Sequence, residues 1–415
     1  MMMKLIGPFK QIITLNNLPL KGALKDEQLE IIENGGILVN NGFIQKVGNY
    51  KELKATCDAL NTVFEIVKED CVALPGFVDA HTHICFAGSR AKDYAARNNG
   101  KTYLEIAANG GGIWDTVQQT RLASEEELAE LMHKRIAKML ANGITTAEVK
   151  SGYGLSTDQE LKILRVIKKV SQSTTIDLIA TCLAAHIIPK EHDSEEIYLN
   201  EVLEQLVPSI KKENLCHRFD IFIEKGAFST ENASKYLREL KTQNFDLVIH
   251  GDQFTVGGSE VAINCEAISV DHLEASTVKE ITALSKSEVI PVVLPGASIG
   301  LGCGFAPARA LLDAGCSLVI ASDWNPGSAP QGDLLFQAAV LGTFEKLSAA
   351  EIFAGITFRA AKALNLNDRG KIQTGQKADF IVFPTNDFRE ILYHQGQLKP
   401  KAVWKDGQNL FIQNN

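Results

Sequence analysis

Two histidines one residue apart follow a short apolar run in FVDAHTHICFAGSR, residues 77–90. Histidine is both a strong neutral metal ligand and a base that titrates near neutral pH. Because side chains at positions i and i+2 of a strand point to the same side, His81 and His83 are able to clasp one ion. The alternative is a pair of solvated or hydrogen-bonded histidines at a strand end, and this stretch alone does not decide between the two.

The middle of the chain alternates apolar strand candidates with helical segments. The eight strand candidates are residues 77–80, 144–149, 177–183, 219–224, 245–249, 267–271, 289–294 and 317–321. Apolar strands separated by helices indicate a parallel sheet that is covered on its outer face. Eight such units close into a (β/α)8 barrel, and a doubly wound open sheet is the alternative.

The elements around these strands carry clear boundary signals. In SEEELAELMHKRIAKMLANG, Ser124 and Glu127 form a capping box, and Asn142-Gly143 supplies the end of the helix. Residues 1–72 instead contain short strands joined by turns, and this pattern returns from about residue 370. Asn41-Gly42 favours a two-residue hairpin, since both residues tolerate positive φ.

Catalytic side chains of such a barrel lie just after the strands, so the residues at the strand ends test the interpretation. Five of the nine histidines fall there, namely His81, His83, His186, His250 and His272. Lys150 and Tyr153 follow the second strand, Glu224-Lys225 ends the fourth, and Asp323 follows the eighth.

The predicted metal ligands are His81, His83, His250 and Asp323. Three imidazoles and one carboxylate suit zinc or ferrous iron, and they leave room for water. A divalent ion held in this way makes water a nucleophile near neutral pH. Asp323 is placed to take the proton of that water and to pass it to a leaving group. Taken singly, His250 or Asp323 is equally consistent with a hydrogen-bonding residue at a strand end.

The composition narrows the class of partner. The net charge is −8, 45% of residues are hydrophobic, and no run is dense in lysine or arginine. This argues against nucleic acid or an anionic membrane and favours a small-molecule substrate. No stretch reaches the roughly 18 apolar residues of a membrane span, and we expect no signal peptide. Eight cysteines without CxxC spacing predict a reducing, cytoplasmic location.

Several motifs resemble one known superfamily. PGFVDAHTH together with the late GKIQTGQKADFIVF resembles the amidohydrolase superfamily. HTHICFAGSR, KSGYGLST, AAHIIP, EKGAFS, DHLE, LPGA and SDWNPGS resemble its imidazolonepropionase family. The resemblance implies an α/β protein in which a metal-bearing (β/α)8 TIM-like barrel, residues 73–359, lies beside a small β-sandwich domain. Both chain termini, residues 1–72 and 360–415, would form that small domain.

The resemblance also implies an activity and a set of site residues. The implied reaction is hydrolysis of the cyclic amide C–N bond of 4-imidazolone-5-propanoate to N-formimidoyl-L-glutamate, with one Zn²⁺ or Fe²⁺/Fe³⁺ per chain. The propionate group needs a cation, and Arg90 offers two parallel hydrogen bonds. The substrate-binding residues that we expect are Arg90, Tyr153, His186, Gln253, Asn325, Gly327 and Ser328. A homodimer is compatible with the resemblance, and the sequence leaves the oligomeric state and the choice of metal open.

Proton transfer involves His272, Asp323 and Gln253. His272 is placed to polarise the carbonyl group or to shuttle a proton, and a fifth, weak contact with the metal is the alternative. Some members of the family carry Glu at the position of Gln253, but Gln orients a substrate or water without taking a proton. General-base duty then falls to His272 or Asp323, and the sequence does not choose between them.

Three alternatives stay open at this point. Related deaminases share the ligand set but have no need of Arg90 as a carboxylate anchor. Dinuclear relatives bridge two metals with a carbamylated lysine at the end of the fourth strand, where this chain has Glu224-Lys225; we therefore expect one metal. A non-catalytic scaffold would have no reason to retain ligands at several strand ends.

Overall fold

Eight parallel strands form the central sheet of the computed structural model, which describes the chain apart from residues 1–2, 58–60, 102–104, 106–109 and 413–415. They are β6 (Phe77–Asp79), β7 (Ile144–Lys150), β8 (Asp177–Ala185), β9 (Arg218–Ile223), β10 (Asp246–Gly251), β11 (Ser269–His272), β12 (Ile290–Val293) and β13 (Val319–Ile320). Each strand pairs with its neighbours in chain order. Every strand candidate overlaps one of these strands, so all eight predictions are confirmed.

The sheet closes just beyond its first and last strands. Thr82 and Trp324 form a parallel bridge, and the His83 amide donates to the Trp324 carbonyl at 3.0 Å. The Asp323 amide donates to the His81 carbonyl, also at 3.0 Å. The HTH and SDW segments therefore make the closing contact themselves. The fold is a barrel, and the alternative of a doubly wound open sheet is wrong.

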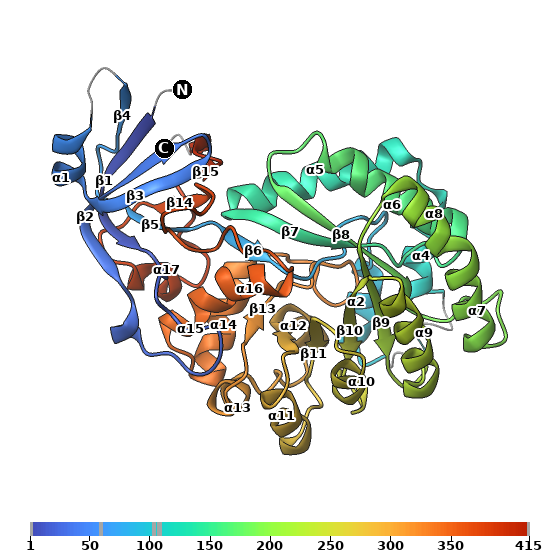
Figure 1. Cartoon of the computed structure of the whole chain (residues 1–415). Helices are drawn as coiled ribbons and strands as arrows, with labels where there is room; N and C mark the ends of the chain where they lie inside the picture. The colour runs from blue at the N-terminus through green and yellow to red at the C-terminus, as the bar shows by residue number, and fades with distance from the viewer. Residues whose placement is uncertain (1–2, 58–60, 102–104, 106–109, 413–415) are drawn as a thin grey trace.

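Helices cover the outside of the barrel (Figure 1). They are α2 (Ala91–Asn98), α4 (Ile113–Leu122), α5 (Glu125–Ala141), α6 (Thr157–Ser171), α7 (Glu195–Glu201), η2 (Val202–Leu206), α8 (Val207–Glu213), α9 (Thr230–Thr242), α10 (Gly258–Asn264), α11 (Val278–Ser285), α12 (Pro295–Leu301), α13 (Ala308–Asp313), α14 (Leu334–Glu345), α15 (Ala349–Gly355) and α16 (Phe358–Ala363). The capping box of α5 is confirmed: the Glu127 amide donates to Ser124 Oγ at 3.2 Å, and the Ser124 amide donates to Glu127 Oε2 at 2.9 Å. No helix within the described ranges is long and apolar enough to cross a bilayer.

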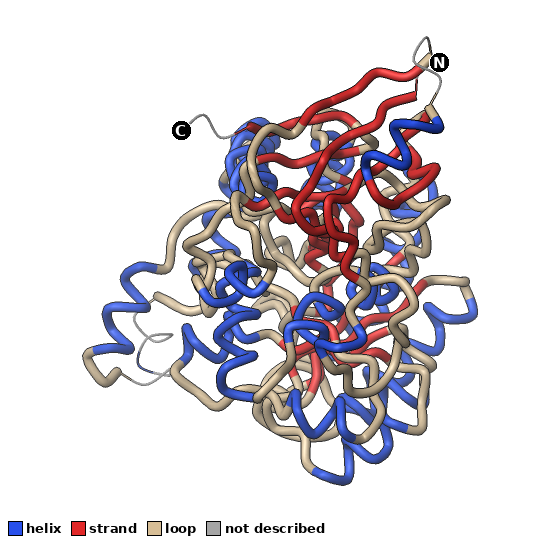
Figure 2. The backbone as a smooth tube through the Cα atoms, turned by 90° about the vertical axis from the view of Figure 1, so that its left-hand side faces the viewer, coloured by secondary structure: helices blue, strands red, loops and turns tan. Residues whose placement is uncertain are grey.

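A second sheet combines both ends of the chain. Its strands are β1 (Met3–Ile13), β2 (Ile31–Asn40), β3 (Phe43–Asn49), β4 (Thr62–Ile66), β5 (Val72–Pro75), β14 (Phe380–Phe383), β15 (Ala402–Lys405) and β16 (Gln408–Ile412), and η1 (Asp26–Gln28), α1 (Tyr50–Thr56) and α17 (Arg389–Tyr393) accompany them. The hairpin prediction is confirmed, because Asn41 and Gly42 join β2 to β3 with φ of 52° and 81°. Figure 2 shows this sheet at the end of the molecule where both termini lie.

The two chain ends share one apolar core. Phe9 from β1 packs edge-on against Phe380 and Trp404, with ring centroids 6.1 and 6.4 Å away. The rings of Phe380 and Trp404 stack at 4.8 Å. A separate sheet built from both termini is therefore confirmed. The exact division at residues 72 and 360 stays a prediction.

Candidate metal centre

Four predicted ligands converge at the carboxyl ends of the barrel strands. His81 Nε2 lies 3.1 Å from His83 Nε2, which lies 3.4 Å from His250 Nε2. Asp323 Oδ1 lies 3.5 Å from His81 Nε2 and 3.4 Å from His83 Nε2. Tetrahedral zinc with Zn–N distances of 2.0–2.1 Å requires ligand atoms about 3.4 Å apart, which these separations match. The barrel therefore brings together the four residues that the sequence predicts as ligands.

The protonation states of these residues also suit a cation. Burial lowers the pKa of His81 well below its usual value and that of His250 to about 4, so both rings are neutral and offer lone pairs. Burial alone would raise the pKa of Asp323, but the hydrogen bond and charge of His83 lower it, so the carboxylate stays ionised. Three imidazole nitrogens and one carboxylate oxygen, all from buried residues, form a donor set that fits a single zinc or iron ion.

Two buried aspartates contact the Nδ1 atoms of two of the clustered histidines. His81 Nδ1 lies 2.6 Å from Asp271 Oδ2, and His250 Nδ1 lies 2.9 Å from Asp220 Oδ2. A carboxylate at Nδ1 fixes the tautomer that presents Nε2 to a metal. Sequence reasoning missed both aspartates, although an acidic residue inside an apolar strand, as in RFDIFI and SVDH, was an available signal.

His186 and Tyr153 form one wall beside the ligands. The ring of His186 stacks on that of His83, with centroids 5.4 Å apart and an interplanar angle of 19°. The ring centroid of Tyr153 lies 5.5 Å from that of His186 and 6.0 Å from that of His83. Burial and the Asp323 charge raise the pKa of Tyr153, so its hydroxyl keeps its proton and is available as a donor. The structure therefore brings both of these predicted substrate-binding residues to the cluster.

His272 approaches the cluster from β11. Its ring centroid lies 5.3 Å from that of His250, and its Nδ1 lies 3.5 Å from Glu274 Oε2. The backbone of His272 has φ of 90° and that of Asp323 has φ of 51°. Such conformations are costly for residues other than glycine and concentrate at functional sites.

Asn325 binds Asp323 Oδ2, the carboxylate oxygen other than the Oδ1 atom near the histidines. Its Nδ2 donates to Asp323 Oδ2 at 2.8 Å, and its Oδ1 accepts the amides of Gly327 and Ser328 at 2.7 and 2.8 Å. Ser328 Oγ also lies 3.4 Å from Asp323 Oδ2. The Asn-Pro-Gly turn thus borders the cluster and fixes the direction of the Asp323 carboxylate.

Arg90 reaches the same turn from the start of α2. A Cβ atom at Gly327 would lie 2.6 Å from Arg90 Nη1 and 3.3 Å from Asn325 Oδ1. Arg90 Nε donates to Asp93 Oδ2 at 2.7 Å, which leaves the end of the guanidinium beside Gly327. The partner Asp93 was not found from sequence, since an aspartate three residues after an arginine is unremarkable there.

Gln253 is less closely engaged. It lies in the turn after β10, its side chain is partly exposed, and it forms no hydrogen bond with the described residues. Its predicted roles therefore receive no geometric support beyond its place at a strand end.

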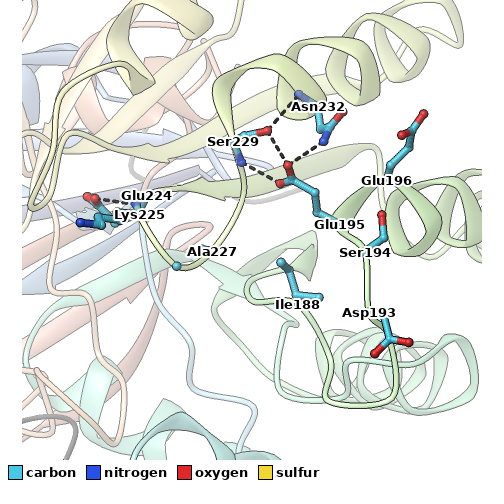
Figure 3. A pocket seen from close by; sticks show the side chains of 11 residues that line it. Ile188, Asp193, Ser194, Glu195, Glu196, Glu224, Lys225, Ala227, Ser229 and Asn232 are labelled. Carbon is cyan, nitrogen blue, oxygen red and sulfur yellow. Dashed lines mark hydrogen bonds between the residues drawn. The ribbon is translucent and has the colours of Figure 1, made fainter.

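A separate cavity of about 530 Å³ lies beside the loops after β8 and β9 (Figure 3). Acidic side chains line it, among them Asp193, Glu195 and Glu224, together with Lys225. Glu195 accepts hydrogen bonds from Ser229 and Asn232, so this carboxylate is occupied within the protein. Lys225 lines this cavity, and its side chain is exposed. None of the predicted site residues lines the cavity.

Comparisons with known proteins agree with this geometry. The model of the amidohydrolase family matches residues 72–410. The imidazolonepropionase of Bdellovibrio bacteriovorus is 37% identical over 411 residues, covering 97% of this chain and 96% of that protein. The imidazolonepropionase of Deinococcus radiodurans is 38% identical over 401 residues, covering 96% of this chain and 98% of that protein.

Solved structures share the fold at low sequence identity. An adenosine deaminase from Xanthomonas campestris with bound zinc matches with a TM-score of 0.73 and 18% identity, over 99% of this chain and 93% of that chain. An atrazine chlorohydrolase from Arthrobacter aurescens with zinc matches with a TM-score of 0.72 and 15% identity, over 99% and 95%. By sequence identity and coverage, the chain belongs to the amidohydrolase family and, within it, to the imidazolonepropionases.

Proposed function

We propose that this protein hydrolyses 4-imidazolone-5-propanoate to N-formimidoyl-L-glutamate, a step of histidine degradation, with one zinc or iron ion per chain. The observation that carries the proposal is the convergence of three Nε2 atoms and one carboxylate oxygen at the carboxyl ends of the barrel strands. The relatives named imidazolonepropionase, at 37–38% identity over nearly the whole chain, support the choice of substrate.

His81, His83, His250 and Asp323 would hold the ion. When bound, such an ion polarises a carbonyl group and activates water near neutral pH. The exposure of Lys225 supports a single ion, because a lysine that bridges two ions would be buried against the cluster.

The reaction adds the oxygen of water to the ring carbonyl carbon and breaks the adjacent C–N bond. Asp323 takes the proton of the attacking water on its carboxylate, which Asn325 keeps directed toward the cluster. His272, 5.3 Å from the His250 ring, polarises the carbonyl group or supplies the proton that the departing ring nitrogen needs. Gln253 orients substrate or water and carries no proton.

Substrate binding falls to residues around the cluster. Arg90 binds the propionate carboxylate through its guanidinium, beside the turn of Asn325, Gly327 and Ser328. Tyr153 donates from its protonated hydroxyl, and His186 packs against the ring of the substrate.

The test incubates metal-replete protein with 4-imidazolone-5-propanoate and follows the loss of ring absorbance. We expect N-formimidoyl-L-glutamate without release of ammonia. Arg90→Ala should raise KM at least tenfold with metal content unchanged, and Arg238→Ala on the outer helix α9 is the matched control. Turnover of a purine or pyrimidine ring with ammonia release, and none of the imidazolone, would instead identify a deaminase.

The cellular setting is part of the proposal. All eight cysteines are free, and seven of them are partly or fully buried, as expected for a protein of the reducing cytoplasm. We propose a homodimer that acts on this small molecule without nucleic acid or membrane partners. Sedimentation of the purified protein tests the oligomeric state.

A further inference from the structure

A buried lysine lies directly beneath the metal cluster. Lys150 ends β7, and its side chain is fully buried. Its Nζ lies 2.7 Å from Glu148 Oε2, 2.7 Å from Asp220 Oδ2 and 3.6 Å from Asp271 Oδ2. Burial alone would lower the pKa of Lys150, but the three carboxylates raise it, so the side chain is an ammonium ion.

Two of these three carboxylates are the ones that contact the ligand histidines. The oxygen of Asp220 that meets Lys150 also lies 2.9 Å from His250 Nδ1. The oxygen of Asp271 nearest to Lys150 lies 2.6 Å from His81 Nδ1. The Lys150 ammonium group therefore contacts two aspartates from different strands, and each aspartate in turn contacts a different proposed ligand histidine.

The other oxygen of each carboxylate is tied to the barrel wall. Ser269 Oγ donates to Asp271 Oδ1 at 2.7 Å, and the His250 amide donates to Asp220 Oδ1 at 3.2 Å. Each aspartate is thus held at one oxygen by the barrel and at the other by Lys150 and a histidine. Without the ammonium group, Asp220 Oδ2 and Asp271 Oδ2 would lie near each other in the buried interior with no lysine cation between them.

A second metal ion is the other way to satisfy these groups. Ligand atoms of Asp220, His250 and Asp271 lie close enough together to hold one. However, Lys150 Nζ already contacts Asp220 at 2.7 Å, the distance of a charge-assisted hydrogen bond. The positive charge at this point is supplied by the chain itself.

We propose that Lys150 is a positioning residue of the metal centre, which aims Asp220 and Asp271 at the Nδ1 atoms of His250 and His81 and so sets the affinity for the ion. The inference rests on the metal site of the proposed function. It predicts that Lys150 acts on metal binding although it contacts none of the ligands' Nε2 atoms.

The experiment measures zinc affinity of the chelator-stripped protein by competition with a chromophoric chelator, along with thermal unfolding of the metal-free form. We expect Lys150→Met to weaken zinc binding about 10–100-fold, the usual effect of losing a partner that orients a ligand. Lys162→Met is the matched control, because Lys162 Nζ donates to three backbone carbonyls at the end of α4, those of Thr120, Arg121 and Ala123. Its zinc affinity should equal that of the unaltered protein.

The charge-balanced double variant Lys150→Met with Glu148→Gln separates positioning from charge compensation. It removes one positive and one negative buried group, and Thr181 can still donate to the side chain at position 148. The double variant should regain stability in the metal-free form yet bind zinc as weakly as the single variant. A folded double variant with undiminished zinc affinity would overturn the inference. Failure of the unaltered protein to bind zinc or iron would instead overturn the proposed function.

Discussion

Arg90 Nη1 occupies the space that a side chain at Gly327 would fill, since a Cβ atom there would lie 2.6 Å away. This contact joins the loop after β6 to the loop after β13. Asp93 holds the other side of the guanidinium at 2.7 Å, so Arg90 has little room to move aside. A side chain at position 327 would therefore force the end of the Arg90 guanidinium to shift.

Gly327→Ala should displace the Arg90 guanidinium and raise KM for 4-imidazolone-5-propanoate about tenfold or more. Metal content should stay unchanged, because the substitution adds a methyl group beside Arg90 and removes no ligand. Gly304→Ala is the matched control, since a Cβ atom there meets nothing within 4 Å. Steady-state kinetics and metal analysis check both variants, and an unaltered KM in Gly327→Ala would remove Arg90 from substrate binding.

Binding of zinc to the folded protein should stabilise it by mass action. At a free zinc concentration 100 times Kd, we expect the free energy of unfolding to rise by about 2.7 kcal/mol over the metal-free protein. His83→Ala removes a central Nε2 atom of the cluster and should abolish most of this gain. His133→Ala, an exposed histidine on α5, should retain it in full. Denaturant unfolding with and without zinc measures the difference, and equal gains in both variants would contradict the ligand assignment.

Glu160 shapes the loop that carries Tyr153. Its Oε2 accepts the Gly152 amide at 3.0 Å, and its Oε1 accepts the amides of Gly154 and Leu155 at 2.7 and 2.8 Å. Glu160→Gln would turn an NH2 group toward one of these donors, at a cost of about 1–3 kcal/mol. We expect a lower free energy of unfolding and a higher KM, with zinc affinity unchanged.

Urea unfolding and steady-state kinetics test this expectation, and Glu130→Gln on the exposed side of α5 is the control. A loss of stability without any change in KM would show that the loop does not position Tyr153 for the substrate.

The strands, and the convergence of the four residues proposed as metal ligands, were predictable because each depends on local sequence. Apolar runs gave all eight barrel strands, and His81, His83, His250 and Asp323 were found because each follows or ends such a run. The closing bridge between Thr82 and Trp324 could not be predicted, since it joins residues more than 200 positions apart. Pairing across the barrel is a property of the closed fold and leaves no local pattern.

The groups behind the ligands were missed for a related reason. Asp220, Asp271 and Glu148 each interrupt an apolar strand, and one acidic residue in a strand gives no sign of its partner. Lys150 was noticed at a strand end, but two of its three acidic neighbours come from β9 and β11. Only the curvature of the barrel brings these charges to one point in its interior.

Asp177 links the barrel to the terminal sheet. It begins β8, and its Oδ2 lies 3.0 Å from Lys405 Nζ of β15 and 3.1 Å from Lys377 Nζ, and it also pairs with Arg369. Burial would raise the pKa of Asp177, but these three cations lower it from 3.8 to about 2. A carboxyl group whose pKa is lowered on folding stabilises the folded state above its unfolded pKa. This contribution is lost as the pH falls from about 4 through about 2.

Asp177→Asn should therefore lower the free energy of unfolding at pH 7. The shift in pKa corresponds to about 2 kcal/mol without screening, and because 35% of the side chain is exposed we expect about 1 kcal/mol. The difference from the unaltered protein should shrink below pH 4 and vanish well below pH 2, where the Asp177 carboxyl group is protonated in both the folded and the unfolded state. Urea unfolding at several pH values measures it, with the exposed Asp193→Asn as control. A destabilisation that persists undiminished at pH 2 would mean that packing, and not the charge of Asp177, joins the barrel to the terminal sheet.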